Sequence, residues 1–226
     1  MLTRTFLLLF ICLITINLSA QEEKIMKRIS TGIKVGSEIG MMNLERSNLN
    51  ANTELGVGYS IVVDFIEYHF NNQISANIGV GFTNRKYRQH IENVSFINIF
   101  AQASGREHML VQNIEIPITA KYYLNKKNNR QLYFIGGTTV YYNLHNSFQQ
   151  ELFFSDGTVW EYNHPNGIKR TTLAATFGAG LQFDTNYRLS YILEPILQIN
   201  PNQVSFQYGR DTRALVSLGI MAGMKF

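Results

Sequence analysis

Apolar and polar residues alternate with a period of two along most of the chain after residue 32, and no apolar stripe with the helical period of 3.6 residues persists. In one segment, for example, Val57, Tyr59 and Ile61 alternate with Gly58 and Ser60. The alternation recurs in eight segments, with an ambiguous phase in the aromatic fifth one: 33–41, 57–65, 74–82, 114–122, 132–142, 173–183, 189–197 and 214–226. Each is close to the 9–11 residues with which a tilted strand crosses a bilayer, so the pattern predicts an all-β protein.

Charged residues fall on one face of these predicted strands, and the apolar face carries none. A Lys or Arg side chain that faces lipid near the midplane costs about 2–4 kcal/mol. This separation indicates that the apolar face meets lipid and that the polar face lines a lumen. Nine residues are predicted to form a polar network of ion pairs there: Lys34, Glu38, Asp64, Glu115, Lys121, Arg188, Glu194, Arg213 and Lys225.

A soluble β-sandwich or a lipocalin-like barrel would show the same alternation, with its apolar face turned inward. Three features favour a membrane barrel instead. The polar face is rich in Gly, Ser and Thr, which suit a narrow lumen, and the last segment finishes on Phe226. The connections also alternate between short ones at 71–72, 125–130 and 184–186 and long ones at 42–55, 86–110, 144–170 and 200–211. We therefore predict an eight-stranded antiparallel up-and-down transmembrane β-barrel.

An even number of strands places both ends of the chain on one side of the membrane. We expect the termini in the periplasm and the long loops outside the cell. Aromatic residues near the strand ends are expected to form interfacial girdles: Tyr68, Phe70, Tyr87, Tyr122, Tyr123, Tyr133, Tyr141, Tyr142, Phe183 and Tyr187. Pro117 and Pro195 each remove a backbone donor, so we expect a bulge or a strand end at both.

Residues 1–20 have the composition of a secretory signal peptide. Arg4 provides the positive start, Phe6 to Ile16 the apolar stretch, and Ser19-Ala20 a small-residue cleavage site. The remaining residues, 21–226, form the predicted barrel domain. The single cysteine, Cys12, lies within the predicted signal peptide, which excludes a disulfide scaffold. Without Arg4 the formal charge falls from +4 to +3, too small an excess for a nucleic-acid binder.

The segment Ile114–Leu124, IEIPITAKYYL, resembles a strand of the outer-membrane β-barrel domain family, which includes PorT-like proteins. Gly32 to Gly36, Gly178 to Gly180 and the terminal Phe226 are similar to that family as well. The resemblance implies an eight-stranded barrel in outer-membrane lipid. It also implies insertion by the outer-membrane assembly machinery, with Phe226 as the assembly signal. Some PorT-type members serve type IX secretion.

The candidate chemistry lies in the long connections. His90, His108, His145 and His164 occur there with Glu107, Ser147, Asp156 and Asp211, the residue types of a hydrolase triad or a metal site. Their spacing matches no H-x-x-x-H or G-x-S-x-G motif, so we predict no catalytic residue, metal or cofactor. Within 144–170, an Asp156-Gly157 turn predicts a hairpin. Its aromatic residues are predicted to form a contact surface: Phe148, Phe153, Phe154, Trp160 and Tyr162.

Four functions fit these sequence features. The first is a non-enzymatic barrel that presents surface loops or supports envelope integrity, with residues 85–108 and the hairpin as its contact surface. The second is an accessory component of a secretion or uptake assembly, which meets an envelope partner through Lys126-Lys127 or the tail from Gln21 to Lys27. The third is an outer-rim hydrolase of lipid or peptide, and the fourth is a conducting pore.

Overall fold

The computed structural model describes residues 29–44, 50–96, 99–124, 127, 129–164, 169–185, 189–205 and 212–226. The predicted signal peptide, the tail 21–27, Lys126, Tyr187, Arg188 and Asp211 lie outside these residues. The described part contains ten strands: β1 (Ile29–Leu44), β2 (Asn50–Glu54), β3 (Gly56–His69), β4 (Ile74–Phe96), β5 (Ile99–Tyr123), β6 (Arg130–Phe154), β7 (Val159–His164), β8 (Thr171–Asp184), β9 (Ser190–Ser205) and β10 (Thr212–Lys225). Across those same ranges, no helix has the length and apolar character needed to span a membrane.

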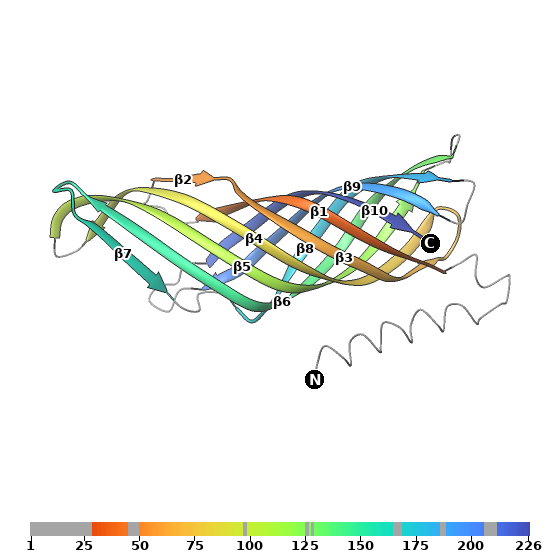
Figure 1. Ribbon diagram of the computed structural model, residues 1–226, viewed down its shortest axis with the longest axis horizontal. Helices are drawn as coiled ribbons and strands as arrows, with labels where there is room; N and C mark the ends of the chain where they lie inside the picture. Colours follow the sequence, from red (N-terminus) through yellow and green to blue (C-terminus); the bar gives the residue numbers. More distant parts are fainter. Residues whose placement is uncertain are drawn as a thin grey trace.

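Eight of the strands form a closed antiparallel ring. The order β4-β3-β1-β10-β9-β8-β6-β5 is completed by pairing of β5 with β4, and Figure 1 shows the resulting tilted barrel. β2 pairs with β4, and β7 pairs with β6. A closed ring is what lipid requires, because an open sheet edge would leave backbone groups without partners. The structure thus confirms the predicted eight-stranded up-and-down barrel.

The two faces of the barrel strands have the predicted polarity. On β1, Val35 and Ile39 are exposed outward, whereas Lys34 and Glu38 between them are buried inside the ring. On β5, Ile116 and Ile118 are exposed and Glu115 is buried. The apolar face is therefore the outer one, as a barrel in lipid requires.

β4, β5 and β6 continue far beyond the membrane-crossing length. They contain 23, 25 and 25 residues, against about 9–11 for a membrane crossing. Their extensions form the left end of the molecule in Figure 1, together with β2 and β7. We call this part the wall and define it as 84–96 of β4, 99–112 of β5, 143–154 of β6, β2 and β7.

The wall corrects the prediction that 42–55, 86–110 and 144–170 are loops. Lys86 pairs with Leu110 and Ser147 in turn pairs with Leu110, so the barrel register continues into the extension. Backbone pairing does not depend on lipid, and it persists where the apolar alternation ends. The predicted hairpin is confirmed: Phe153 pairs with Val159, and Gly157 takes a positive φ of 86° in the turn.

Pro117 and Pro195 lie inside strands, without the expected bulge or strand end. Pro117 pairs with Thr139 on β6 in unbroken register. On its other side, Ile78 pairs with Ile118 and Gly81 with Glu115, again in one register. A residue in an antiparallel strand directs its N–H to one neighbour only, so a proline in the ring removes one bond without displacing the strand.

Two bulges change which residues face inward. The pairing of β3 with β4 shifts between Asp64 and Ile66, so Asp64 and Glu67 are both buried although they are three residues apart. The pairing of β5 with β6 shifts between Gln112 and Asn113, opposite Leu144 on β6. Beyond this second shift, the inward positions of β6 change from odd to even numbers.

The predicted aromatic girdle is only partly present. Phe70, Tyr122 and Tyr142 are exposed on the outer surface. Four others are buried inside the barrel, each with 1–2% of its surface exposed: Tyr87, Tyr123, Tyr133 and Tyr141. Tyr122-Tyr123 and Tyr141-Tyr142 are adjacent pairs, and consecutive residues of a strand face opposite sides. Only one member of each pair faces lipid.

Candidate functional site

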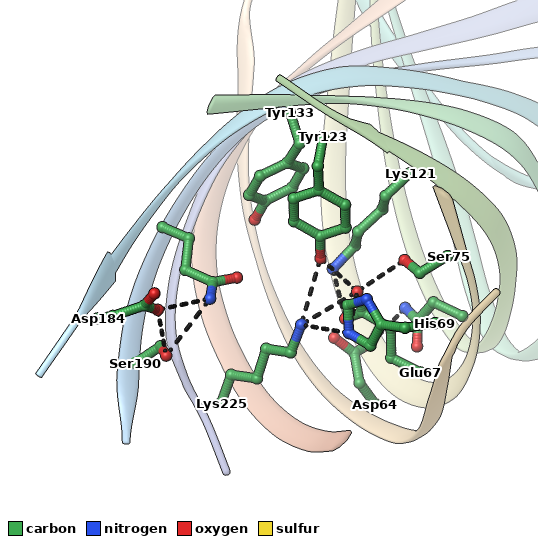
Figure 2. Close-up of polar contacts among 12 residues, drawn as sticks. Asp64, Glu67, His69, Ser75, Lys121, Tyr123, Tyr133, Asp184, Ser190 and Lys225 are labelled. Atoms are coloured by element: carbon green, nitrogen blue, oxygen red, sulfur yellow. Dashed lines mark hydrogen bonds and ion pairs between the residues drawn. The ribbon is translucent and has the colours of Figure 1, made fainter. Parts of the chain in front are cut away.

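The lumen contains an ion-pair network that starts near the end with the short turns, shown in Figure 2. Glu67 is its centre. Its carboxylate lies 3.1 Å from the Lys121 ammonium and 3.1 Å from that of Lys225. The Ser75 hydroxyl donates to it at 2.8 Å, and the Tyr123 hydroxyl donates a further hydrogen bond. β3, β4, β5 and β10 thereby meet at one carboxylate.

Glu194 connects this group to the next layer of the lumen. Its carboxylate lies 3.1 Å from Lys34 and 3.3 Å from Lys121, and it accepts a 2.7 Å hydrogen bond from the Tyr133 hydroxyl. Lys34 also contacts Asp64 at 2.9 Å. Glu194 is completely buried, so each partner replaces a contact that water would otherwise supply.

Arg85 holds the third layer. Its guanidinium donates to Glu38 and to the amide oxygen of Gln198 and lies 3.7 Å from Glu115. The Tyr141 ring lies against it, with its centroid 4.9 Å from the guanidinium carbon. The three layers cross the barrel from side to side and fill it with paired charges.

A small cavity remains between these layers. Its volume, counted as space open to the centre of a water molecule, is about 40 Å³. Lys34, Glu115, Lys121 and Glu194 are among the residues around it. This volume accommodates a few water molecules, since one needs about 10–15 Å³.

Apolar side chains fill the lumen where the barrel joins the wall. They form one buried cluster, which we call the apolar cap: Met42, Tyr87, Met109, Val111, Phe148 and Leu215. β1, β4, β5, β6 and β10 all contribute to the cap. The cap therefore lies across the lumen at the wall end of the ion-pair network.

The structure brings together seven of the nine predicted lumen residues: Lys34, Glu38, Asp64, Glu115, Lys121, Glu194 and Lys225. Arg188 and the side chain of Arg213 lie outside the described part of the chain. Glu67 and Arg85 were not among the predicted residues. Glu67 was missed because the bulge after Asp64 reverses which residues of β3 face inward. Arg85 continues the odd-numbered inward positions of β4 beyond the segment 74–82, and simple extension of that pattern finds it.

The predicted aromatic contact surface is divided between two places. Phe148 is buried in the apolar cap, because the second bulge turns even positions of β6 inward. Trp160 and Tyr162 on β7 are about half exposed, at 50% and 57%. Phe154 packs edge-on against Trp160 with ring centroids 4.9 Å apart. The exposed aromatic surface is thus centred on Phe154, Trp160 and Tyr162.

Where the structure describes them, the histidines and acids considered as candidates for hydrolase or metal chemistry are not gathered into one site. His108 faces outward and Glu107 inward, since they are consecutive residues of β5. Asp156 is in the hairpin turn, where its carboxylate accepts a 2.8 Å hydrogen bond from the Thr158 N–H. Among the described residues, no three His, Cys, Asp or Glu side chains form a group suited to a metal ion. The side chain of His164 lies outside the described part.

Several solved outer-membrane barrels are similar to this chain at low identity. Ail, the attachment invasion locus protein of Yersinia pestis, shares 14% identity over 88% of this chain and 99% of its own, with a TM-score of 0.38. Neisserial surface protein A shares 10% identity over 86% of this chain and 95% of its own, with a TM-score of 0.41. OprG of Pseudomonas aeruginosa shares 11% identity over 88% of this chain and 96% of its own, with a TM-score of 0.35. No curated protein matches the chain.

Residues 19–223 match the family described as Outer membrane protein beta-barrel domain. This range covers every strand of the ring except the last two residues of β10. The match agrees with the closed ring, the apolar outer face and the polar lumen. The chain belongs to the outer membrane protein beta-barrel domain family and is an integral protein of the outer membrane.

Proposed function

We propose that this protein is a non-enzymatic barrel that anchors the wall at the cell surface, where the wall acts as a contact surface. The observation that carries the proposal is the unequal length of the strands. β4, β5 and β6 have 23–25 residues, whereas β3, β8 and β10 have 14. The extra residues serve no membrane crossing and produce a sheet outside the lipid.

The filled lumen supports a role other than conduction. Ion pairs of Lys34, Arg85, Lys121 and Lys225 span it, and the apolar cap follows at one end. The cavity of about 40 Å³ between the layers is far smaller than a solute pathway. An eight-stranded ring has an interior just wide enough for such filling.

The positions of the polar groups in the wall favour a non-enzymatic role. A hydrolase needs a nucleophile, a base and an orienting acid in mutual contact. His108 and Glu107 face opposite sides of β5, and Asp156 is bonded within its own turn. The wall therefore has the character of a binding surface.

We orient the wall toward the outside of the cell. Outer-membrane barrels have short turns on the periplasmic side and long excursions on the outer side. The turn at 70–73 is short, and in Figure 1 the C-terminus lies at the end of the molecule opposite the wall. The exposed side chains of Trp160 and Tyr162 would then be available to an envelope or extracellular partner.

Cysteine labelling on intact cells tests the orientation. Ser155→Cys at the hairpin turn and Asn72→Cys at the opposite end are both at exposed positions. A membrane-impermeant maleimide should label Ser155→Cys on intact cells and Asn72→Cys only after the outer membrane is opened. The reverse order would contradict the orientation and with it the proposed surface role.

Copurification then tests the contact surface. The full chain, solubilised in mild detergent, should retain a stoichiometric partner that the variant Trp160→Ala/Tyr162→Ala loses. Val159→Ala is the matched control, because Val159 is on the same strand and is also 50% exposed. Equal recovery of the partner with both variants would exclude Trp160 and Tyr162 as its contact.

A further inference from the structure

The outer face of the wall next to the lipid carries basic side chains from adjacent strands. Lys86 and Arg88 are exposed on β4, and His108 lies directly opposite Arg88 on β5. Tyr87 and Gln89, between and beyond the two cations, are buried on the inner face. The alternation of β4 therefore fixes Lys86, Arg88 and His108 on the lipid-facing side of the sheet, above the apolar band.

The position of these residues corresponds to the headgroup layer. Tyr59 on β3 pairs with Asn84 on β4, and the Asn84 amide donates to the Tyr59 hydroxyl at 3.3 Å, as is typical of the membrane interface. Lys86 and Arg88 follow Asn84 by two and four residues. At 3.4 Å per residue and a tilt of about 40°, they lie about 5 Å and about 10 Å farther along the barrel axis. The headgroup region is about 5–8 Å thick on each side of the hydrocarbon, so the backbone of Lys86 lies within it and that of Arg88 just beyond it, within the length of an arginine side chain.

Exposed apolar side chains of β3 lie beside the cations and on their membrane side. Tyr59, which pairs with Asn84, is 48% exposed, and Val57, level with Lys86 if that register continues, is 65% exposed. A surface with cations and with apolar residues beside and below them matches an amphipathic anion. A soluble polyanion would gain nothing from Val57 and Tyr59, so the surface favours a lipid.

Among the residues that the structure describes, one acidic side chain lies in this surface. Glu54 on β2 pairs with Arg88 and is exposed. The carboxylate of Glu54 would repel an anion bound at Arg88. It is not paired with Lys86, whose positive charge remains available to an anion. Among the described side chains of this surface, the two cations Lys86 and Arg88 thus outnumber the single carboxylate of Glu54.

We propose that Lys86, Arg88 and His108, with Val57 beside them and Tyr59 below, bind the phosphate group of an outer-leaflet glycolipid of the lipid A type. The phosphate lies between the Lys86 and Arg88 side chains, and an acyl chain packs along Val57 and Tyr59. The inference rests on the proposed orientation, which places this end of the barrel in the outer leaflet. Bound lipid would hold the base of the wall at the membrane surface.

Lipid binding by the full chain in detergent micelles tests the proposal, with native mass spectrometry as the readout. The probes are bisphosphorylated lipid A and the same lipid with both phosphates removed. Wild type should bind the phosphorylated form at least tenfold more tightly. Lys86→Ala/Arg88→Ala should bind it roughly tenfold to thirtyfold more weakly than wild type, since each cation near a lipid surface contributes on the order of a fivefold gain.

Two further variants sharpen the test. Glu54→Gln should bind the phosphorylated lipid about twofold to threefold more tightly, because it removes the acidic neighbour of Arg88. Lys127→Ala/Arg130→Ala changes two exposed cations at the opposite end of the barrel and should bind like wild type. All four proteins should show the same mobility shift on heating in a gel, which confirms that the barrels are folded.

Three results would overturn the proposal: equal binding of the two lipids, unchanged binding by Lys86→Ala/Arg88→Ala, or displacement of the lipid by millimolar inorganic phosphate. The last would identify a site for free phosphate. The micelle measurement does not depend on orientation. The protein could bind the phosphorylated lipid selectively while its wall is labelled only after the membrane is opened. That pair of results would refute the proposed surface role and the outer leaflet as the source of the lipid, but it would retain the phosphate site.

Discussion

The membrane-crossing part of the barrel and the wall differ in the polarity of their two faces although they share strands. On β5, Ile116 faces outward and Glu115 inward within the lipid, whereas His108 faces outward and Met109 inward in the wall. On β6, Phe134 is 56% exposed to the outside, but Phe148 is 4% exposed inside the apolar cap. The environment of the outer face accounts for the reversal, because lipid selects apolar residues and water selects polar ones.

The comparison also separates two sources of stability. Within the lipid, the interior is held by hydrogen-bonded charges, such as Glu194 with Lys34, Lys121 and Tyr133. Where the barrel joins the wall, the interior is held by apolar packing in the cap, although Gln89 and Glu107 are also buried on the inner face of the wall. Substitutions in the two interiors should therefore lower the unfolding free energy by different amounts and for different chemical reasons.

The largest effect is expected for Glu194→Ala. The substitution removes the shared carboxylate and leaves the Lys34 and Lys121 ammonium groups buried with fewer partners. Loss of one member of a buried ion pair costs about 3–5 kcal/mol of unfolding free energy. Urea titration of the protein in lipid vesicles measures the loss. Unchanged stability would mean that water reaches these ammonium groups and that the lumen is not filled.

Phe148→Ala should lower the unfolding free energy by about 3 kcal/mol, because it opens a cavity in the apolar cap. Phe153→Ala is the control on the same strand, since Phe153 faces outward and packs with Arg106 at 5.7 Å. We expect a loss below about 1 kcal/mol for Phe153→Ala. Equal losses for both variants in urea titration would remove the distinction between the inner and outer faces of the wall.

Gly180→Ala should cost about 2 kcal/mol through a steric conflict in the lumen. A Cβ at Gly180 would lie 2.2 Å from the Tyr133 ring, whose hydroxyl donates to Glu194 at 2.7 Å. Gly136→Ala is the matched control, because a Cβ there meets no atom within 4 Å. If thermal unfolding of the two variants in micelles were the same, the Tyr133 ring would not be fixed by Glu194.

The smallest effect is expected at the hairpin turn, outside both interiors. The Thr158 N–H donates to the Asp156 carboxylate, and this hydrogen bond holds the pKa of Asp156 below its ordinary value. A lowered pKa means that the contribution to the turn is present above the unfolded pKa of about 4 and is lost as the pH falls through the folded value. An NMR titration of the Asp156 carboxyl should show a midpoint below that of Asp156 in a Thr158→Pro variant. Equal midpoints would indicate that the turn is open.

Period-two alternation was sufficient to predict the ring, because lipid imposes apolar residues on every outward position. It predicted seven lumen residues for the same reason. It failed at Glu67, where one extra residue in β3 exchanges the faces, and at Tyr123, Tyr133 and Tyr141, which are amphipathic enough for either face. It also ended the strands too early at Lys86 and Leu144, since the outer face becomes polar there while the pairing continues.

The pairing of β1 with β10 constrains how the barrel is made. Thr31 and Phe226 exchange two backbone hydrogen bonds, of 3.2 and 2.8 Å, and Gly32 pairs with Lys225, so the seam joins residues almost 200 positions apart. Such a contact is among the slowest to form in any topology. One edge of β1 can pair early with β3, but its other edge stays unpaired until the tenth strand arrives, so closure of the ring depends on the last segment of the barrel.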